Sequence, residues 1–259
     1  MERIMDEESD QFLPEIVSKA IKLPGVKVDR RAFLAKTFHQ LEGAELAQLV
    51  DQGPQSLFGA KDLIKVANRV VLNDTEKSTV FSFAAGLPST PLAMAGTATA
   101  DILQYFAFAV RMAQEVAYVF GRPSIFNEDG ALTEAGEREV MLYLGAMLGV
   151  AAANSGLMLV SRGLGATVGK KMLQATLTKT FWYPLMKKIA GAIGIQVTKK
   201  SASSLVTKTV PIIGGIASGG LTFLTFRPMG KRLVKVFSET LQADDQQIID
   251  AENVVVSVE

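Results

Sequence analysis

The residue types that most often carry enzyme chemistry are scarce in this chain. It has no cysteine, which excludes disulfides, thiolate catalysis and cysteine-based zinc sites, and its single histidine is His39. The neighbours of His39 are mostly polar and typical of a half-exposed amphipathic helix, so a structural role is favoured over a catalytic one. We therefore predict no catalytic residue, no metal site and no cofactor.

Four polar residues form one stripe on the otherwise apolar segment 99–120: Asp101, Gln104, Arg111 and Glu115. Arg111 and Glu115 stand four apart, so they can pair across one helical turn and fix the register of a buried helix. This polar seam could instead line a water path or a ligand cavity. Asp101 and Glu115 would lie about 21 Å apart along the helix, which is too far to share a metal ion.

The glycine pattern favours close helix packing over nucleotide binding. The run from Gly163 to Lys171 lacks the glycine that a phosphate-binding loop needs where the chain has Leu164. Glycines four apart on a helix share one face and allow a neighbouring backbone to approach closely. Two such pairs predict a contact between two helices, and they are Gly145 with Gly149 and Gly215 with Gly219.

Charge is segregated along the chain. Residues 140–238 hold thirteen basic side chains and no acidic one, whereas residues 1–139 hold 14 basic and 20 acidic side chains and are net negative. Basic groups beside apolar, glycine-rich segments indicate anionic lipid rather than nucleic acid, for which no binding motif is visible. The alternative is that the lysines are solvated faces of surface helices. The predicted lipid- or anion-binding residues are Lys170, Lys171, Lys179, Lys187, Lys188, Lys199 and Lys200.

The elements that would position these residues are helices, because no segment shows recurring strand alternation. We predict an all-α helical bundle in which two long, glycine-rich apolar helices, at 140–161 and 209–226, are surrounded by amphipathic helices. The expected divisions are a tail and short helix at 1–22, one helical domain at 23–241 with its basic, glycine-rich half at 140–238, and an acidic tail at 242–259. The N-terminus is acidic and has no apolar core, unlike a secretory signal.

Several short motifs resemble the EcsC family of bacterial proteins. They are Leu-Pro-Gly-Val-Lys-Val-Asp at 23–29, Ala-Asp-Ile-Leu-Gln at 100–104, Ala-Gln-Glu-Val-Ala-Tyr-Val-Phe-Gly at 113–121 and Lys-Thr-Val-Pro-Ile-Ile-Gly-Gly at 208–215. The likeness covers roughly residues 80–240. It implies a helical, membrane-associated bacterial protein, and it carries over no catalytic residue.

These observations lead to one main functional hypothesis and two rivals. The main hypothesis is a non-enzymatic, cytoplasmic protein, peripheral to or inserted in the inner face of the cell membrane. Its basic half would engage anionic lipid or insert as a helical hairpin, with a membrane or transporter protein as a further partner. The first rival is a soluble helical bundle that binds a partner protein or an apolar ligand. The second is a hydrolase or transferase whose site lies in the polar seam.

Overall fold

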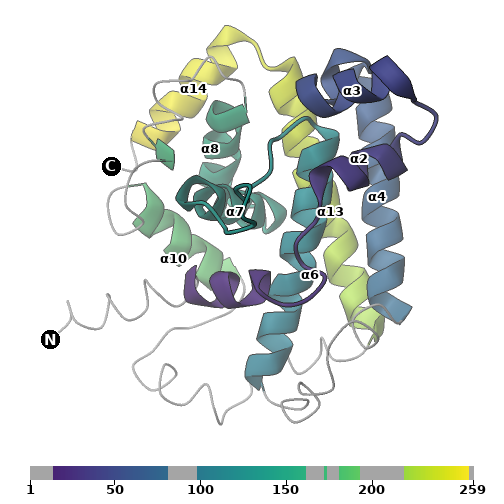
Figure 1. Ribbon diagram of the computed structural model, residues 1–259. Coiled ribbons are helices and arrows are strands. Elements are labelled where there is room, and N and C mark those ends of the chain that lie inside the picture. The colour runs from purple at the N-terminus through teal and green to yellow at the C-terminus, as the bar shows by residue number, and fades with distance from the viewer. Residues whose placement is uncertain (1–13, 81–97, 162–171, 174–180, 193–218, 257–259) are drawn as a thin grey trace, which may run out of the picture.

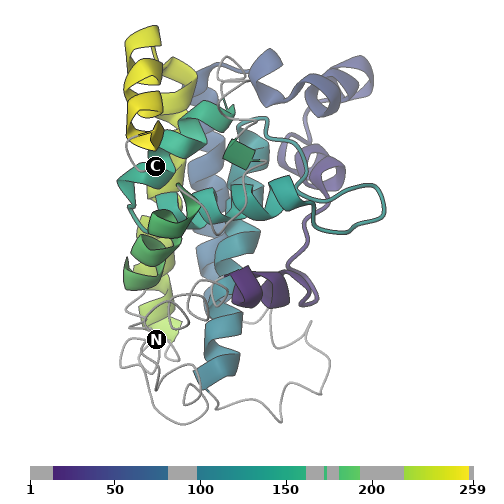
Figure 2. The same cartoon turned by 90° about the vertical axis from the view of Figure 1, so that its left-hand side faces the viewer.

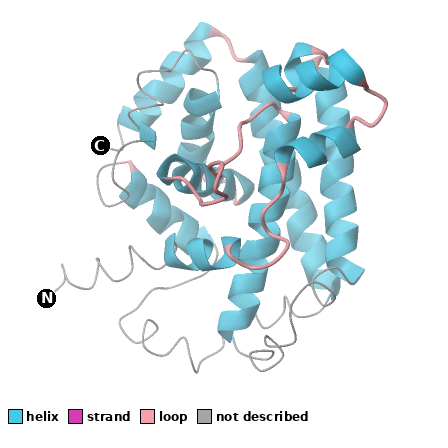
Figure 3. Cartoon of the chain, viewed as in Figure 1, coloured by secondary structure: helices cyan, strands magenta, loops and turns pink. Residues whose placement is uncertain are grey.

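The computed structural model of the chain describes residues 14–80, 98–161, 172–173, 181–192 and 219–256. Within these ranges the protein is helical, and its only β feature is an isolated bridge between Phe126 and Leu132 (Figure 3). The prediction of an all-α fold is confirmed for this part of the chain. Besides a helical stretch at 14–21, the helices are α2 (Arg30–Thr37), α3 (Gly43–Gln52), the 3-10 turn η1 (Pro54–Ser56), α4 (Ala60–Val80), α6 (Ala98–Val119), α7 (Glu134–Met147), α8 (Ala151–Ser161), α10 (Trp182–Ala192), α13 (Gly219–Gln242) and α14 (Asp245–Val256).

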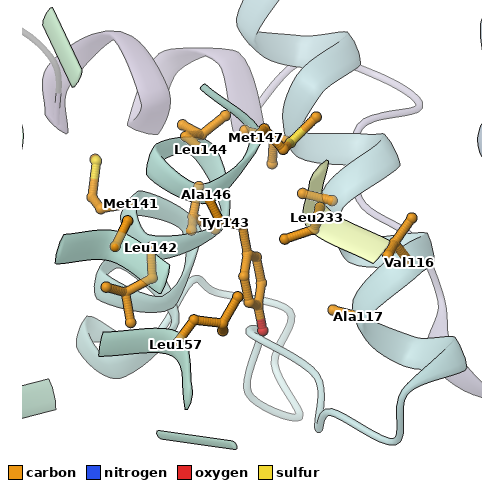
Figure 4. Close-up of a cluster of buried hydrophobic side chains, with 14 of the residues drawn as sticks. Val116, Ala117, Met141, Leu142, Tyr143, Leu144, Ala146, Met147, Leu157 and Leu233 are labelled. Atoms are coloured by element: carbon orange, nitrogen blue, oxygen red, sulfur yellow. The ribbon is translucent and has the colours of Figure 1, made fainter. Parts of the chain in front are cut away.

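The three longest helices, α4, α6 and α13, pack against one another and form one side of the molecule (Figure 1). The shorter helix α7 packs against α6, α8, α10 and α13, and its residues 138–147 are all buried. Its side chains meet Val116 and Ala117 of α6, Leu157 of α8 and Leu233 of α13 in one apolar cluster (Figure 4). Helices α2 and α3 lie on the opposite side of the molecule from α14 (Figure 2). The core is thus built around α7.

Local sequence signals place several helix ends. Asp29 is the N-cap of α2, where its side chain accepts a hydrogen bond from the Ala32 N–H. Thr133 caps α7 in the same way by accepting from the Gly136 N–H. The clearest predicted helix, 99–120, corresponds to α6.

The prediction of one long apolar helix at 140–161 is wrong, because the chain turns at Gly149. Helix α7 ends at Met147 and α8 begins at Ala151. Gly149 has a φ of +81°, the left-handed conformation that favours glycine just after a helix. The Val150 N–H donates to the Gly145 carbonyl and the Gly149 N–H donates to the Ala146 carbonyl, which is the paired pattern of a Schellman C-cap.

The predicted pairing of Gly145 and Gly149 on one helix face also fails, since Gly149 lies outside the helix. Gly145 does allow a close approach, but its neighbours are Ala153 of α8 and Ile189 of α10. A Cβ atom at position 145 would lie 2.5 Å from the Cβ atom of Ala153. Gly215 lies outside the described residues, and Gly219 is the first residue of α13, whose side-chain surroundings there are not described.

The second predicted apolar helix, 209–226, also differs from the structure. Residues 209–218 lie outside the described residues, and 219–226 are the first part of α13. That helix continues through Pro228 to Gln242 and carries the basic residues of 227–235. None of the helices in the described ranges combines the length and the apolarity that crossing a membrane requires.

The expected acidic tail at 242–259 is corrected as well, since Asp245–Val256 forms α14 and packs against α8. Asp244 and Gln247 form a reciprocal capping box, in which each side chain accepts from the other's backbone N–H at 2.8 and 3.0 Å. Ile248, Ala251 and Val255 form its buried face. The short helix at 14–21 likewise buries apolar residues in the core, so this helix and α14 both contribute to the domain.

Candidate functional site

A half-open cleft of about 440 Å³ lies between α2, α4, α6 and the segment that precedes α2. Each helix contributes one face, with positions three or four apart. The lining residues are Lys27, Val28, Asp29, Ala32, Phe33, Lys36, Thr37, His39, Val66, Arg69, Val70, Asn73, Asp74, Arg111 and Glu115. Ten of these fifteen residues are polar or charged, and the apolar ones are Val28, Ala32, Phe33, Val66 and Val70. The cleft is therefore more polar than most small-molecule sites, and charged groups would dominate recognition of a ligand there.

Two residues of the predicted polar seam, Arg111 and Glu115, lie in this cleft. They form an ion pair of 2.8 Å between Nη2 and Oε1, as the sequence predicted. Arg111 also donates to the carbonyl of Gly25. The seam does not continue as a buried stripe, because Gln104 is exposed to solvent. Asp101 belongs to α6, but its side-chain environment is not described.

Gln114 is a fully buried polar residue that the sequence analysis missed. Its side-chain amide accepts from the Val28 N–H at 3.2 Å and donates to the Val26 carbonyl at 2.9 Å. These bonds attach the segment before α2 to α6 and thereby shape one wall of the cleft. A glutamine in the middle of an apolar helix was the available signal, because a buried amide needs partners.

A second polar cluster lies in the core, away from the cleft lining. The Arg122 guanidinium pairs with the Glu139 carboxylate, with 2.6 Å between Nη2 and Oε1, and also donates to the Val160 carbonyl. The Tyr143 hydroxyl donates to the other carboxylate oxygen of Glu139.

The surroundings of this cluster shift the pKa values of its members. Burial, followed by the charge of Glu139, raises the pKa of Tyr143 well above its ordinary value. Burial lowers the pKa of Arg122, but Tyr143 and Glu139 outweigh it and the net shift is upward. Because these side chains are largely buried, the cluster joins α7 and α8 to the segment that follows α6.

Arginine side chains in this protein repeatedly bind main-chain carbonyls near helix ends. Arg30 donates to Val50 near the end of α3 and to the carbonyl of Arg122 just after α6. Arg232 donates to Met147, the last residue of α7, and Arg122 donates to Val160 near the end of α8. These carbonyls would otherwise lack helical partners. Arg232 therefore has a structural role, although it belongs to the basic half of the chain.

Among the described residues of the basic half, the exposed cations lie on α10 and α13. Lys187 and Lys188 are exposed on α10, whose opposite face, Trp182, Leu185, Met186 and Ile189, is buried in the core. On α13, Arg227, Lys231 and Lys235 stand four apart and are exposed, with Lys235 3.6 Å from Glu239. The other predicted lipid-binding residues lie outside the described residues; they are Lys170, Lys171, Lys179, Lys199 and Lys200.

His39, the only histidine, lies exposed at the cleft. Within the described ranges no three histidine or carboxylate side chains come together as a metal site would require. Comparison with protein-family models, curated proteins and solved structures found no match for this chain.

Proposed function

We propose that this is a non-enzymatic helical protein that associates with anionic membrane surfaces through its basic half, residues 140–238. The observation that carries the proposal is the absence of any acidic residue among the thirteen basic ones of this segment. Ordinary surface helices use acidic residues freely to pair their lysines. A surface without them is suited to lipid headgroups, where each cation contributes about 1 kcal/mol.

The mode of association proposed is electrostatic attachment rather than insertion. Helix α10 supports this choice, because its apolar face packs in the core and, among its described side chains, Lys187 and Lys188 are the exposed ones. The resemblance to the EcsC family agrees with a bacterial protein at the inner face of the membrane. A membrane or transporter protein would then be a natural second partner.

Replacing Lys187 and Lys188 by glutamine should weaken binding to vesicles of phosphatidylcholine and phosphatidylserine by about tenfold to thirtyfold. Sedimentation of the vesicles with the full-length protein measures the affinity. Binding should also fall as salt is raised, since exposed charges are screened within about 8 Å at physiological ionic strength.

The matched control is the replacement of Lys61 and Lys65 by glutamine. These lysines are also exposed and share one helix, α4, but belong to the net-negative part of the chain. The control should bind vesicles as the parent does. An equal loss in both variants, or salt-independent binding, would rule out attachment through this surface.

The cleft favours the second candidate, a helical protein that binds a small ligand or partner. This candidate predicts that the protein stays in solution with anionic vesicles at low salt.

A further inference from the structure

We infer that the cleft between α2, α4 and α6 binds a small organic anion that carries an apolar or aromatic portion. The volume of about 440 Å³ is within the range of ligand pockets. This site is separate from the basic half of the chain, because every lining residue lies between positions 27 and 115. The inference therefore does not depend on membrane association.

The charged side chains of the cleft indicate that its ligand is an anion, because two of its cations have neither an acidic partner nor a ring contact among the described residues. Two of its carboxylates are already engaged, because Glu115 pairs with Arg111 and Asp29 caps α2. Asp74 has a partner as well, although its buried Oδ2 atom accepts no hydrogen bond from the described residues. Two of its cations are also engaged, because Arg111 binds Glu115 and Lys27 lies over the Phe126 ring, 5.1 Å from its centroid.

Lys36 and Arg69 differ from these two cations, because neither takes part in an ion pair or a ring contact within the described part of the chain. Both line the cleft and both are exposed, and within the described part of the chain neither has an acidic partner within 4.0 Å. They come from two helices, α2 and α4, that line the same cleft, so both can contribute to binding a carboxylate, sulfonate or phosphate group there. The guanidinium of Arg69 can bind such a group with two parallel hydrogen bonds.

The remainder of the lining specifies what accompanies the anionic group. Phe33 of α2 is half-buried. Val70 of α4 is buried, and Val66 lies four residues before it on the same helix. Together they offer an apolar surface next to Lys36 and Arg69. A planar or aliphatic portion of the ligand would cover this surface, while Asn73 and Thr37 could exchange hydrogen bonds with its polar edge.

The probe for this site is 8-anilinonaphthalene-1-sulfonate, which joins a sulfonate to an apolar ring system and fluoresces when bound. The parent protein should bind it saturably with one site per chain. Arg69→Gln should weaken binding about tenfold, as expected when a charge-assisted hydrogen bond is lost, and Lys36→Gln should weaken it in the same direction. Lys65→Gln is the matched control, because Lys65 is exposed on α4 but does not line the cleft.

A second probe separates specific anion binding from adhesion to apolar surface. N-phenyl-1-naphthylamine has the same rings without the sulfonate, so its affinity should be nearly equal in the parent and in Arg69→Gln. The inference is overturned if Arg69→Gln and Lys65→Gln bind the sulfonate alike, or if both probes lose affinity equally in Arg69→Gln. The Lys187 and Lys188 double variant should retain full binding of the sulfonate, so failure of the vesicle experiment would leave this result intact.

Discussion

Arg122→Met is expected to lower the free energy of unfolding by about 3–5 kcal/mol, the cost of removing one partner from a buried ion pair. The side chains of Arg122 and Glu139 are only 12% and 8% exposed. Without the guanidinium, the Glu139 carboxylate keeps the Tyr143 hydroxyl as its only side-chain donor among the described residues. The Val160 carbonyl loses its arginine donor as well. Urea unfolding followed by far-ultraviolet circular dichroism measures the change.

The double variant Arg122→Met with Glu139→Leu tests whether the loss of stability comes from leaving the buried Glu139 carboxylate without its arginine partner. Apolar replacement of a whole buried pair is often nearly neutral, so the double variant should recover much of the lost stability. Arg31→Met is the matched control, because Arg31 is exposed on α2 and has no ion pair within the described ranges. A loss below about 1 kcal/mol in Arg122→Met would show that water reaches this cluster and that the pair does not hold the core.

Gly145→Leu is expected to cost about 3 kcal/mol, the upper end of the usual cost of overpacking a core. The Cβ atom of the new side chain would already lie 2.5 Å from the Ala153 Cβ atom and 3.3 Å from the Ile189 Cδ1 atom. Both neighbours are fully buried, so α8 and α10 would have to move away from α7. Thermal unfolding of the variant and the parent gives the measurement.

Gly149→Ala gives an informative comparison with Gly145→Leu. Gly145 allows close helix packing, whereas Gly149 adopts a left-handed backbone conformation. A Cβ atom at position 149 would have room, with its nearest neighbour 3.9 Å away on Arg232. The left-handed φ of +81° should nevertheless cost about 1 kcal/mol. Gly59→Ala, with open space and an ordinary φ, should cost little. If Gly145→Leu matched Gly59→Ala in stability, the close packing of α7, α8 and α10 would be refuted.

Features that depend on neighbouring residues could be predicted from the sequence. The helix caps Asp29 and Thr133 are features of this kind, because a capping side chain bonds to an N–H only two or three residues away. The Arg111–Glu115 pair was predicted for the same reason, since one helical turn brings the two residues together. The capping box of Asp244 and Gln247 is equally local, and Ile248, Ala251 and Val255 have helical spacing. These signals were available, but the segment was predicted as an acidic tail and α14 was missed.

Features that depend on tertiary contacts could not be predicted. The sequence around a glycine does not show whether it ends a helix or packs against another helix, so Gly149 and Gly145 were not distinguished. The cleft draws on segments that begin at Lys27 and end at Glu115, and only the fold brings them together. Arg122 and Glu139 are separated by a loop, so no helical period relates them.

The arginine bonds to carbonyls have a consequence for the order of events in folding. Arg30 and Arg122 are 92 positions apart in the chain, and Arg232 and Met147 are 85 apart. Such contacts form only after a long loop has closed, so they contribute little to a folding nucleus built from local helices. Weakening them should therefore accelerate unfolding and leave the refolding rate nearly unchanged. In this protein the arginines would determine how long the native state persists, and stopped-flow measurements on Arg30→Lys would show whether they do.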